Sequence, residues 1–195
     1  MRRLFLAVPV VAILMTLSGC GVNTIPTEQQ QVQAAWSQVL NEYQRRTDLI
    51  PNLVATVKGY ARHERRVLTE VTRARSRVTA TPIPADVLTN PQAFHAFEHN
   101  QAQLGSALSR LMVVTENYPN LKADQNFLTL QSQLEGTENR IAVARRDYIR
   151  AVQRYNTELT TYPGRWWAEL LYKNAHVMQN FSISHKAMAA PQVHF

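Results

Sequence analysis

The stretch EQQQVQAAWSQVLNEYQRRTDLIPNLVATVKGYARHERRVLTEV (residues 28–71) decides the fold, because apolar side chains recur in it at alternating spacings of three and four residues. Such spacing is typical of a helix that packs one face against other helices. The pattern predicts a single helix over residues 28–79, which would be about 78 Å long at the rise of an α-helix. Its apolar seam comprises Val32, Trp36, Val39, Tyr43, Ile50, Leu53, Val57, Tyr60, Val67 or Leu68, and Val71.

Pro51 interrupts the hydrogen bonding of this helix, since it has no N–H to donate to the carbonyl of Thr47. The apolar seam keeps its phase across the proline, so we expect a kink rather than a loop. In an alternative interpretation, Asp48 caps a new helix that begins at this point.

The run RRTDLIPN (residues 45–52) around this proline is the most distinctive feature of the sequence. In a structural interpretation, Asp48 and Asn52 hydrogen-bond the exposed backbone, while Arg45 and Arg46 pair with acids of a neighbouring helix. The functional alternative is a surface at the kink on which a partner protein docks.

The rest of the chain predicts further helices, separated by breaks that contain proline. Two prolines exclude a helix from the connection 80–90, and an asparagine cap followed by proline then begins a helix over residues 91–118. A third helix is predicted over 121–162 and a short one over 165–175. We therefore expect an all-α fold, an elongated antiparallel bundle of three long helices plus a short C-terminal helix. The predicted bundle covers residues 28–175, and an irregular tail covers 176–195.

The N-terminus has the pattern of a lipoprotein signal. Two arginines precede an apolar run of about 14 residues (4–17), which is short for a membrane span but typical of a signal peptide. The run ends Leu-Ser-Gly-Cys at Cys20, the single cysteine of the chain. We predict that residues 1–19 are a signal peptide, that Cys20 is lipidated and that residues 20–27 form a tether. The alternative is an uncleaved N-terminal anchor.

This N-terminus predicts a protein of the cell envelope, anchored in a membrane and facing the periplasm or the exterior. Glycine rather than aspartate follows Cys20, which favours the outer membrane if the host has two membranes. The formal net charge is +7, but the basic residues are scattered along helix faces. We interpret them as solvated and expect no nucleic-acid partner.

Motifs that carry chemistry are scarce. The run HAFEH places His95, Glu98 and His99 in the H-x-x-E-H pattern of some zinc peptidases. A catalytic zinc ion needs a third protein ligand, and no acidic helix motif further along the chain stands out as its source. We therefore interpret both histidines as solvated and predict no enzyme activity, no metal, no cofactor and no small-molecule substrate.

Several unbroken runs together resemble the LemA family. They are YQRRTDLIPNLV (43–54), TVKGYARHE (56–64), ENYPNLKA (116–123), LEGTENRI (134–141) and RRDY (145–148), and the resemblance covers about residues 20–162. It implies an envelope protein with an N-terminal membrane segment and a helical bundle outside the cytoplasm, without an established enzymatic activity. It also implies association with envelope remodelling or with membrane proteases and signalling proteins.

The arithmetic of helix lengths adds a hypothesis about partners. The predicted helix over 91–118 is about 42 Å long and would cover only about half of the first helix. The apolar stripe in the half of the first helix nearer the membrane then lacks intrachain partners. It would pack against a second copy of the chain or against another membrane protein. Alternatively, residues 165–195, with Trp166 and Trp167, fold back over it. The candidate partner-binding residues are Trp36, Val39, Tyr43, Arg45, Arg46, Asp48, Pro51 and Asn52.

We therefore expect a membrane-anchored envelope scaffold or adaptor. The alternative function is an accessory or regulatory subunit of a membrane protease or sensor system.

Overall fold

The computed structural model describes residues 21–181, and these residues form an all-α fold. The predicted signal peptide, the predicted lipidation at Cys20 and the predicted tail beyond residue 181 lie outside the described residues. Four helices are long: α2 (Thr24–Tyr60), α3 (Arg65–Ala80), α4 (Pro91–Thr115) and α6 (Gln125–Thr160). Two are short: α5 (Pro119–Lys122) and α7 (Gly164–Leu170). The predicted fold class, a helical bundle, is confirmed.

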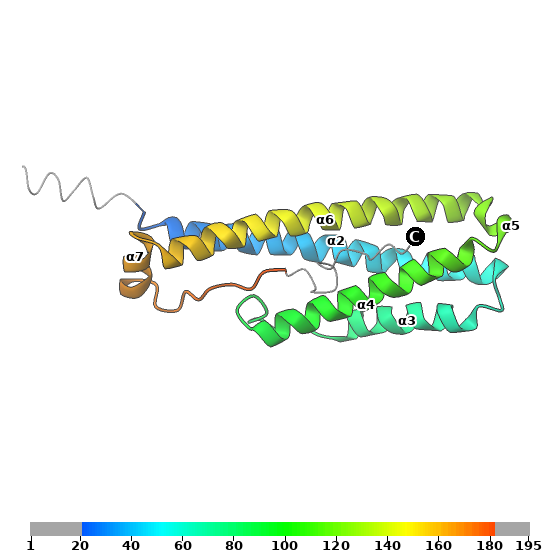
Figure 1. Cartoon of the computed structure of the whole chain (residues 1–195), viewed down its shortest axis with the longest axis horizontal. Helices are drawn as coiled ribbons and strands as arrows, with labels where there is room; N and C mark the ends of the chain where they lie inside the picture. Colours follow the sequence, from blue (N-terminus) through cyan, green and yellow to red (C-terminus); the bar gives the residue numbers. More distant parts are fainter. Residues whose placement is uncertain (1–20, 182–195) are drawn as a thin grey trace, which may run out of the picture.

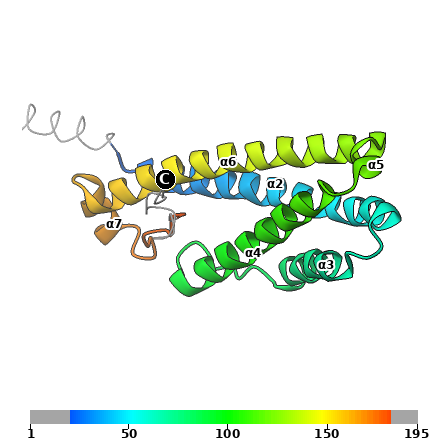
Figure 2. The same cartoon turned by 45° about the vertical axis from the view of Figure 1, so that its right-hand side comes forward.

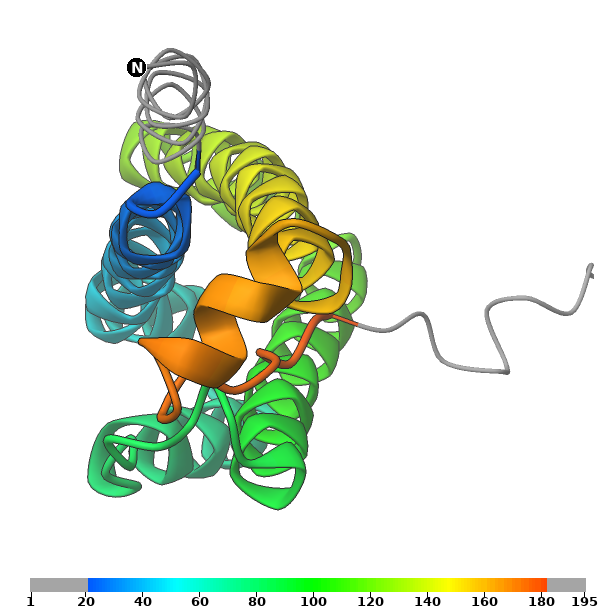
Figure 3. The same ribbon diagram turned by 90° about the vertical axis from the view of Figure 1, so that its left-hand side faces the viewer.

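The helices form two antiparallel pairs in an elongated rod. α2 and α6 lie side by side along the rod, and α3 and α4 make a second pair beside the half of the rod farther from α7 (Figure 1). α4 runs obliquely, and α5 connects its end to the start of α6 (Figure 2). α7 crosses the end of the rod at which α2 begins (Figure 3). Within residues 21–181, no helix is both long and apolar enough to cross a bilayer.

The single helix predicted over residues 28–79 is wrong, because the chain reverses at residues 61–64. α2 ends at Tyr60, and Gly59 weakens the helix shortly before that end. A helix that continued straight would leave the apolar face of residues 65–80 in water. Reversal instead buries Leu68, Val71 and Ala74 against α2 and α4. The hydroxyl of Tyr118 holds the turn by donating a 2.9 Å hydrogen bond to Glu64.

α2 also begins earlier than predicted, at Thr24, so the predicted tether over 20–27 is too long. The early start has a physical reason, since Ile25 is buried in the core and Pro26 is tolerated in the first helical turn. The expectation that the helix continues through Pro51 is confirmed, so the alternative of a new helix capped by Asp48 is wrong.

The remaining boundaries follow from local capping. Asn90 caps α4 as predicted, and its side chain accepts hydrogen bonds from the N–H groups of Gln92 and Ala93 at 3.1 and 3.2 Å. Asp124 caps α6 in the same way through the N–H of Phe127, so that helix begins after residue 121. α7 ends at Leu170, and residues 176–181 have no helix, as expected of the predicted tail.

The interior contains two apolar clusters, one in each half of the rod. The first joins the start of α2, the end of α6, the start of α4 and the segment that follows α7. The second joins the end of α2, α3, the end of α4 and the start of α6. The buried side chain of Arg46 lies between the two clusters.

Candidate partner-binding site

The stripe of Trp36, Val39 and Tyr43 is core, so the hypothesis that it lacks intrachain partners is wrong. The exposed fractions of these side chains are 7%, 0% and 6%. The ring of Trp36 lies 5.8 Å from that of Phe94 and 5.3 Å from that of Tyr148, measured between centroids. Because α3 runs back along α2, the start of α4 reaches the half of α2 that the predicted helix lengths left uncovered. These three residues are therefore not an exposed docking surface.

The segment after α7 also covers this stripe, as the alternative interpretation proposed. The rings of Phe181 and Phe94 lie 5.1 Å apart, and Met178 is buried in the same cluster. Asn156 of α6 holds the segment through two hydrogen bonds of 2.9 Å, to the N–H and the carbonyl of Met178.

Arg46 is the buried centre of a polar layer between the two apolar clusters. Its guanidinium donates to a Glu138 carboxylate oxygen at 3.0 Å and to the side-chain oxygen of Gln101 at 2.7 Å. A second ion pair, between Arg140 and Glu42 at 3.1 Å, lies beside it across α6 and α2. The expectation that an arginine of this run pairs with an acid on a neighbouring helix is confirmed for Arg46.

The other predicted docking residues of this run lie on the outer face of α2. The side chains of Arg45, Asp48, Pro51 and Asn52 are all exposed. Asp48 accepts a hydrogen bond of 2.7 Å from Gln44, one turn away. The backbone carbonyl that lacks a donor because of the proline is satisfied by an arginine of α3 instead of Asp48 or Asn52. This face therefore remains a predicted interaction surface without a cavity of its own.

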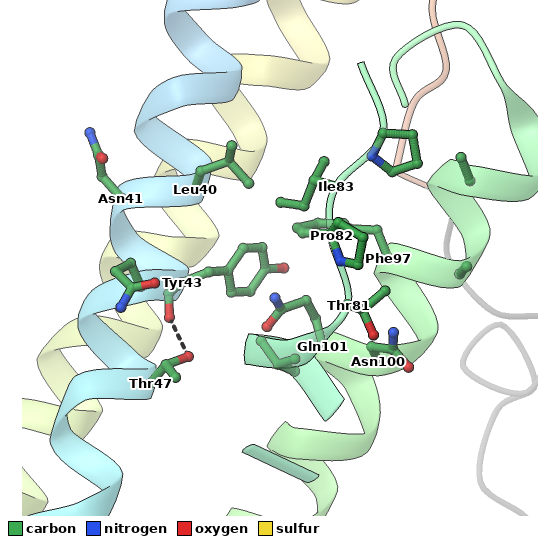
Figure 4. A pocket seen from close by; sticks show the side chains of 15 residues that line it. Leu40, Asn41, Tyr43, Thr47, Thr81, Pro82, Ile83, Phe97, Asn100 and Gln101 are labelled. Carbon is green, nitrogen blue, oxygen red and sulfur yellow. Dashed lines mark hydrogen bonds between the residues drawn. The ribbon is translucent and has the colours of Figure 1, made fainter. Parts of the chain in front are cut away.

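A pocket opens beside this run, between α2, the segment 81–84 and α4. Its volume is about 370 Å³. The ring of Tyr43 points from α2 into the pocket, towards Pro82 on the connecting segment and Phe97 on α4 (Figure 4). The lining residues are Leu40, Asn41, Tyr43, Gln44, Thr47, Val78, Thr81, Pro82, Ile83, Pro84, Ala93, Ala96, Phe97, Asn100 and Gln101. We call this hollow the Tyr43 pocket.

The chemistry of the Tyr43 pocket is that of a binding site for a neutral group. None of its 15 described lining residues carries a charge, and aliphatic and aromatic walls alternate with amides and hydroxyls. Burial raises the pKa of the Tyr43 hydroxyl above its usual range, although Arg145 and Arg46 act in the opposite direction. Tyr43 is therefore a protonated donor at neutral pH. Such a pocket can enclose an apolar side chain and hydrogen-bond the groups around it.

His95 and His99 lie on another face of α4 from the Tyr43 pocket, in a groove of about 620 Å³ between α4 and α6. His95 Nδ1 lies 3.2 Å from a Glu98 oxygen, and His99 Nε2 lies 2.7 Å from the amide nitrogen of Gln103. Among the described residues, no three His, Cys, Asp or Glu side chains are grouped to hold a metal ion. The geometry gives the zinc pattern no third ligand in this part of the chain.

Sequence reasoning missed Ile83, Phe97 and Gln101 as site residues. Ile83 lies between two prolines, and its exposed apolar side chain in a polar connection was a usable signal. Phe97 was interpreted only as part of a helix seam. Gln101 had no signal, because its role depends on an arginine 55 positions earlier in the chain.

Comparison with known proteins identifies relatives of the chain and its family. Magnetosome proteins MamQ 1 and MamQ 2 of Paramagnetospirillum magneticum are each 27% identical to the chain over 201 residues, which covers 94% of this chain and 74% of each relative. Protein LemA of Metamycoplasma hominis is 23% identical over 140 residues, covering 72% of this chain and 60% of that protein. The names of these relatives describe no reaction. The model of the LemA family matches residues 35–195, and the chain therefore belongs to the LemA family.

Proposed function

We propose that the chain is a membrane-anchored, non-enzymatic scaffold or adaptor of the cell envelope that holds a protein partner at the Tyr43 pocket. The observation that carries the proposal is the uncharged lining of this pocket between α2, α4 and the segment 81–84. Acid–base or nucleophilic catalysis requires titratable or activated groups, whereas an apolar wall with neutral donors and acceptors serves recognition.

The size and lining of the Tyr43 pocket fit one large apolar side chain of the partner. Aromatic and aliphatic anchors that fill a pocket dominate the binding energy of many interfaces. Asn100 on α4 and Gln44 on α2 line the pocket with amide groups that can hydrogen-bond the backbone beside such an anchor. Ile83 is exposed at the lip and extends the apolar contact.

The anchor in this proposal is a lipid on Cys20, formed after removal of residues 1–19. The apolar run and the Leu-Ser-Gly-Cys sequence support it. Intact mass spectrometry of the protein from membranes tests it, and we expect a chain that begins at Cys20 and carries acyl groups. An unmodified Cys20 on a full-length chain would show an uncleaved anchor instead.

Site-specific photocross-linking tests the adaptor function. A photoreactive residue at Ile83 should cross-link the partner in membranes, whereas one at the exposed Val143 on α6 should not. Ala96→Trp should abolish the Ile83 cross-link, because Ala96 lines the pocket and is exposed enough for the indole to fill it. Ala142→Trp places an indole on an exposed part of α6 outside the pocket and is the matched control. Unchanged cross-linking in Ala96→Trp, with an unchanged melting temperature, would exclude the pocket as the docking point.

A further inference from the structure

An exposed apolar patch lies at the end of the rod where α2 begins. Tyr162, Trp166, Leu170 and Leu171 are 62%, 61%, 67% and 55% exposed. All four lie on or directly beside α7, and the rings of Tyr162 and Trp166 contact each other with centroids 5.0 Å apart. We call these four residues the α7 patch. Exposing a cluster of apolar side chains to water is unfavourable, and such a cluster commonly marks an interaction surface.

The position of the α7 patch identifies what covers it. Gly21, the first described residue, lies against α7, since a Cβ atom built on it would be 3.7 Å from Nε1 of Trp167. Leu17 ends the apolar N-terminal run four residues earlier. Four extended residues reach at most about 14 Å. Whether the anchor is a lipid on Cys20 or an uncleaved segment, it therefore ends within a short distance of α7.

The composition of the patch matches the boundary between lipid head groups and acyl chains. Tryptophan and tyrosine favour this boundary, because their rings are apolar while the indole N–H and the phenol can remain hydrated. Leu170 and Leu171 supply aliphatic surface for the acyl region. Charged groups flank the patch, with Arg165 paired to Glu169 at 2.9 Å and Lys173 exposed. This arrangement is typical of short interfacial helices.

We propose that α7 is a membrane-interface helix that inserts Tyr162, Trp166, Leu170 and Leu171 into the lipid surface beside the N-terminal anchor. This inference rests on the proposed membrane anchoring and adds a second point of contact. One flexible attachment leaves a rod free to tilt, whereas two adjacent attachments restrict its orientation.

The consequence is a defined height for the Tyr43 pocket. α7 crosses the end of the rod, so insertion of α7 directs the long axis away from the bilayer (Figure 3). Tyr43 lies 19 residues after Thr24 in α2, which places the pocket about 29 Å from this end at the helical rise. A partner bound there is engaged through a domain or loop that projects about this far from the membrane.

Depth-dependent fluorescence quenching tests the inference on the full chain, reconstituted through its own N-terminus into phosphatidylcholine and phosphatidylglycerol vesicles. The difference between the emission spectra of the wild type and Trp166→Phe gives the emission of Trp166. The difference between the wild type and Trp36→Phe gives the emission of a core tryptophan. We expect lipids brominated on their acyl chains to abolish most of the Trp166 emission and to leave the Trp36 emission unchanged. In the vesicles, the Trp166 emission should lie at shorter wavelength than the Trp166 emission of the protein in detergent-free buffer. This shift should be present at every protein-to-lipid ratio.

Flotation of the same vesicles separates this inference from the anchoring on which it rests. Protein that does not float with the vesicles shows that the anchoring is wrong, and the inference falls with it. Protein that floats while its Trp166 emission resists quenching shows that the inference alone is wrong. A shift that appears only at high protein density identifies a second copy of the chain as the cover of the α7 patch, and this also overturns the proposal. The helical circular dichroism of both variants should equal that of the wild type, so that each difference in emission reports the tryptophan removed.

Discussion

The Nε of Arg75 donates a hydrogen bond of 3.2 Å to the carbonyl oxygen of Thr47, the group that Pro51 leaves without its helical donor. In a helix that contains an internal proline, this carbonyl needs another hydrogen-bond donor. Without one, its backbone hydrogen bond is lost. Here the donor comes from α3, which lies beside α2 only because the chain reverses at residues 61–64. The reversal therefore supplies the donor that replaces the hydrogen bond lost at Pro51.

This relationship predicts that Arg75 and Pro51 are coupled in stability. Arg75→Met should lower the free energy of unfolding by about 1 to 2 kcal/mol, the cost of leaving a part-buried carbonyl without a partner. In a Pro51→Ala background, the introduced alanine supplies the missing N–H, so the same substitution should cost clearly less. Chemical unfolding of the four proteins measures the coupling. Equal costs in both backgrounds would show that the Arg75 hydrogen bond does not replace the one lost at Pro51.

The ion pair of a buried Arg46 and a half-exposed Glu138 predicts an asymmetry between its two partners. The side chain of Arg46 is 4% exposed and that of Glu138 is 46% exposed. Glu138→Ala leaves the guanidinium inside the rod without its counter-charge and should destabilise the protein by about 1 to 2 kcal/mol, because Glu138 is half exposed and Arg46 keeps its hydrogen bonds to Gln101. Arg46→Met should cost less, because Glu138 can then turn to water while methionine keeps the packing.

Denaturant titration of both variants, and of the double variant Arg46→Met with Glu138→Ala, checks this asymmetry. The double variant should be more stable than Glu138→Ala alone, since the unpaired buried charge is gone. A larger loss in Arg46→Met than in Glu138→Ala would mean that the arginine contributes mainly through its own contacts rather than through the charge it shares with Glu138.

Local signals in the sequence were sufficient where a few adjacent residues decide the structure. The Asn90 cap and the unbroken apolar phase across Pro51 are such cases, and both were predicted. The reversal after Tyr60 had no comparable signal, because residues 61–64 contain no proline or glycine and the turn depends on where the apolar face of α3 is buried. α4 packs mainly beside the predicted half of α2, but without the reversal its start could not be placed beside the other half, where Phe94 contacts Trp36. The pair of Arg46 and Glu138 spans 92 positions and was beyond any local pattern.

The cap of α6 predicts a pH dependence in the acid range. The N–H of Phe127 and then the hydroxyl of Tyr60, which donates at 2.8 Å, lower the pKa of the Asp124 carboxyl. A carboxyl with a lowered pKa in the folded state stabilises the protein above the pKa of the unfolded chain, about 3.9, and loses this effect as pH falls through the lower value.

The measurement is the difference in unfolding free energy between the wild type and Asp124→Asn, followed from neutral to strongly acidic pH. The difference should be constant above about pH 5 and should shrink as Asp124 becomes protonated. Tyr60→Phe removes one of the two hydrogen bonds and should reduce the pH-dependent part. A difference that stays the same at all pH values would show that the charge of Asp124 contributes nothing to the cap.

Asn156 predicts how the segment after α7 stays on the core. Its amide donates to the carbonyl of Met178 and its oxygen accepts from the N–H of Met178, both at 2.9 Å, so one side chain replaces the two bonds that a neighbouring strand would supply. Asn156→Ala removes both and should free the segment locally at a cost of about 1 to 2 kcal/mol. Hydrogen exchange of the peptide that contains Met178 measures the release, and faster exchange there should leave the protection of α2 and α6 unchanged.

Asn139→Ala is the matched control, since Asn139 is exposed on the same helix. If exchange at Met178 were as slow in Asn156→Ala as in the wild type, the hydrogen bonds of the Gln179 backbone to Tyr148 and Leu88, together with the packed ring of Phe181, would hold the segment without Asn156.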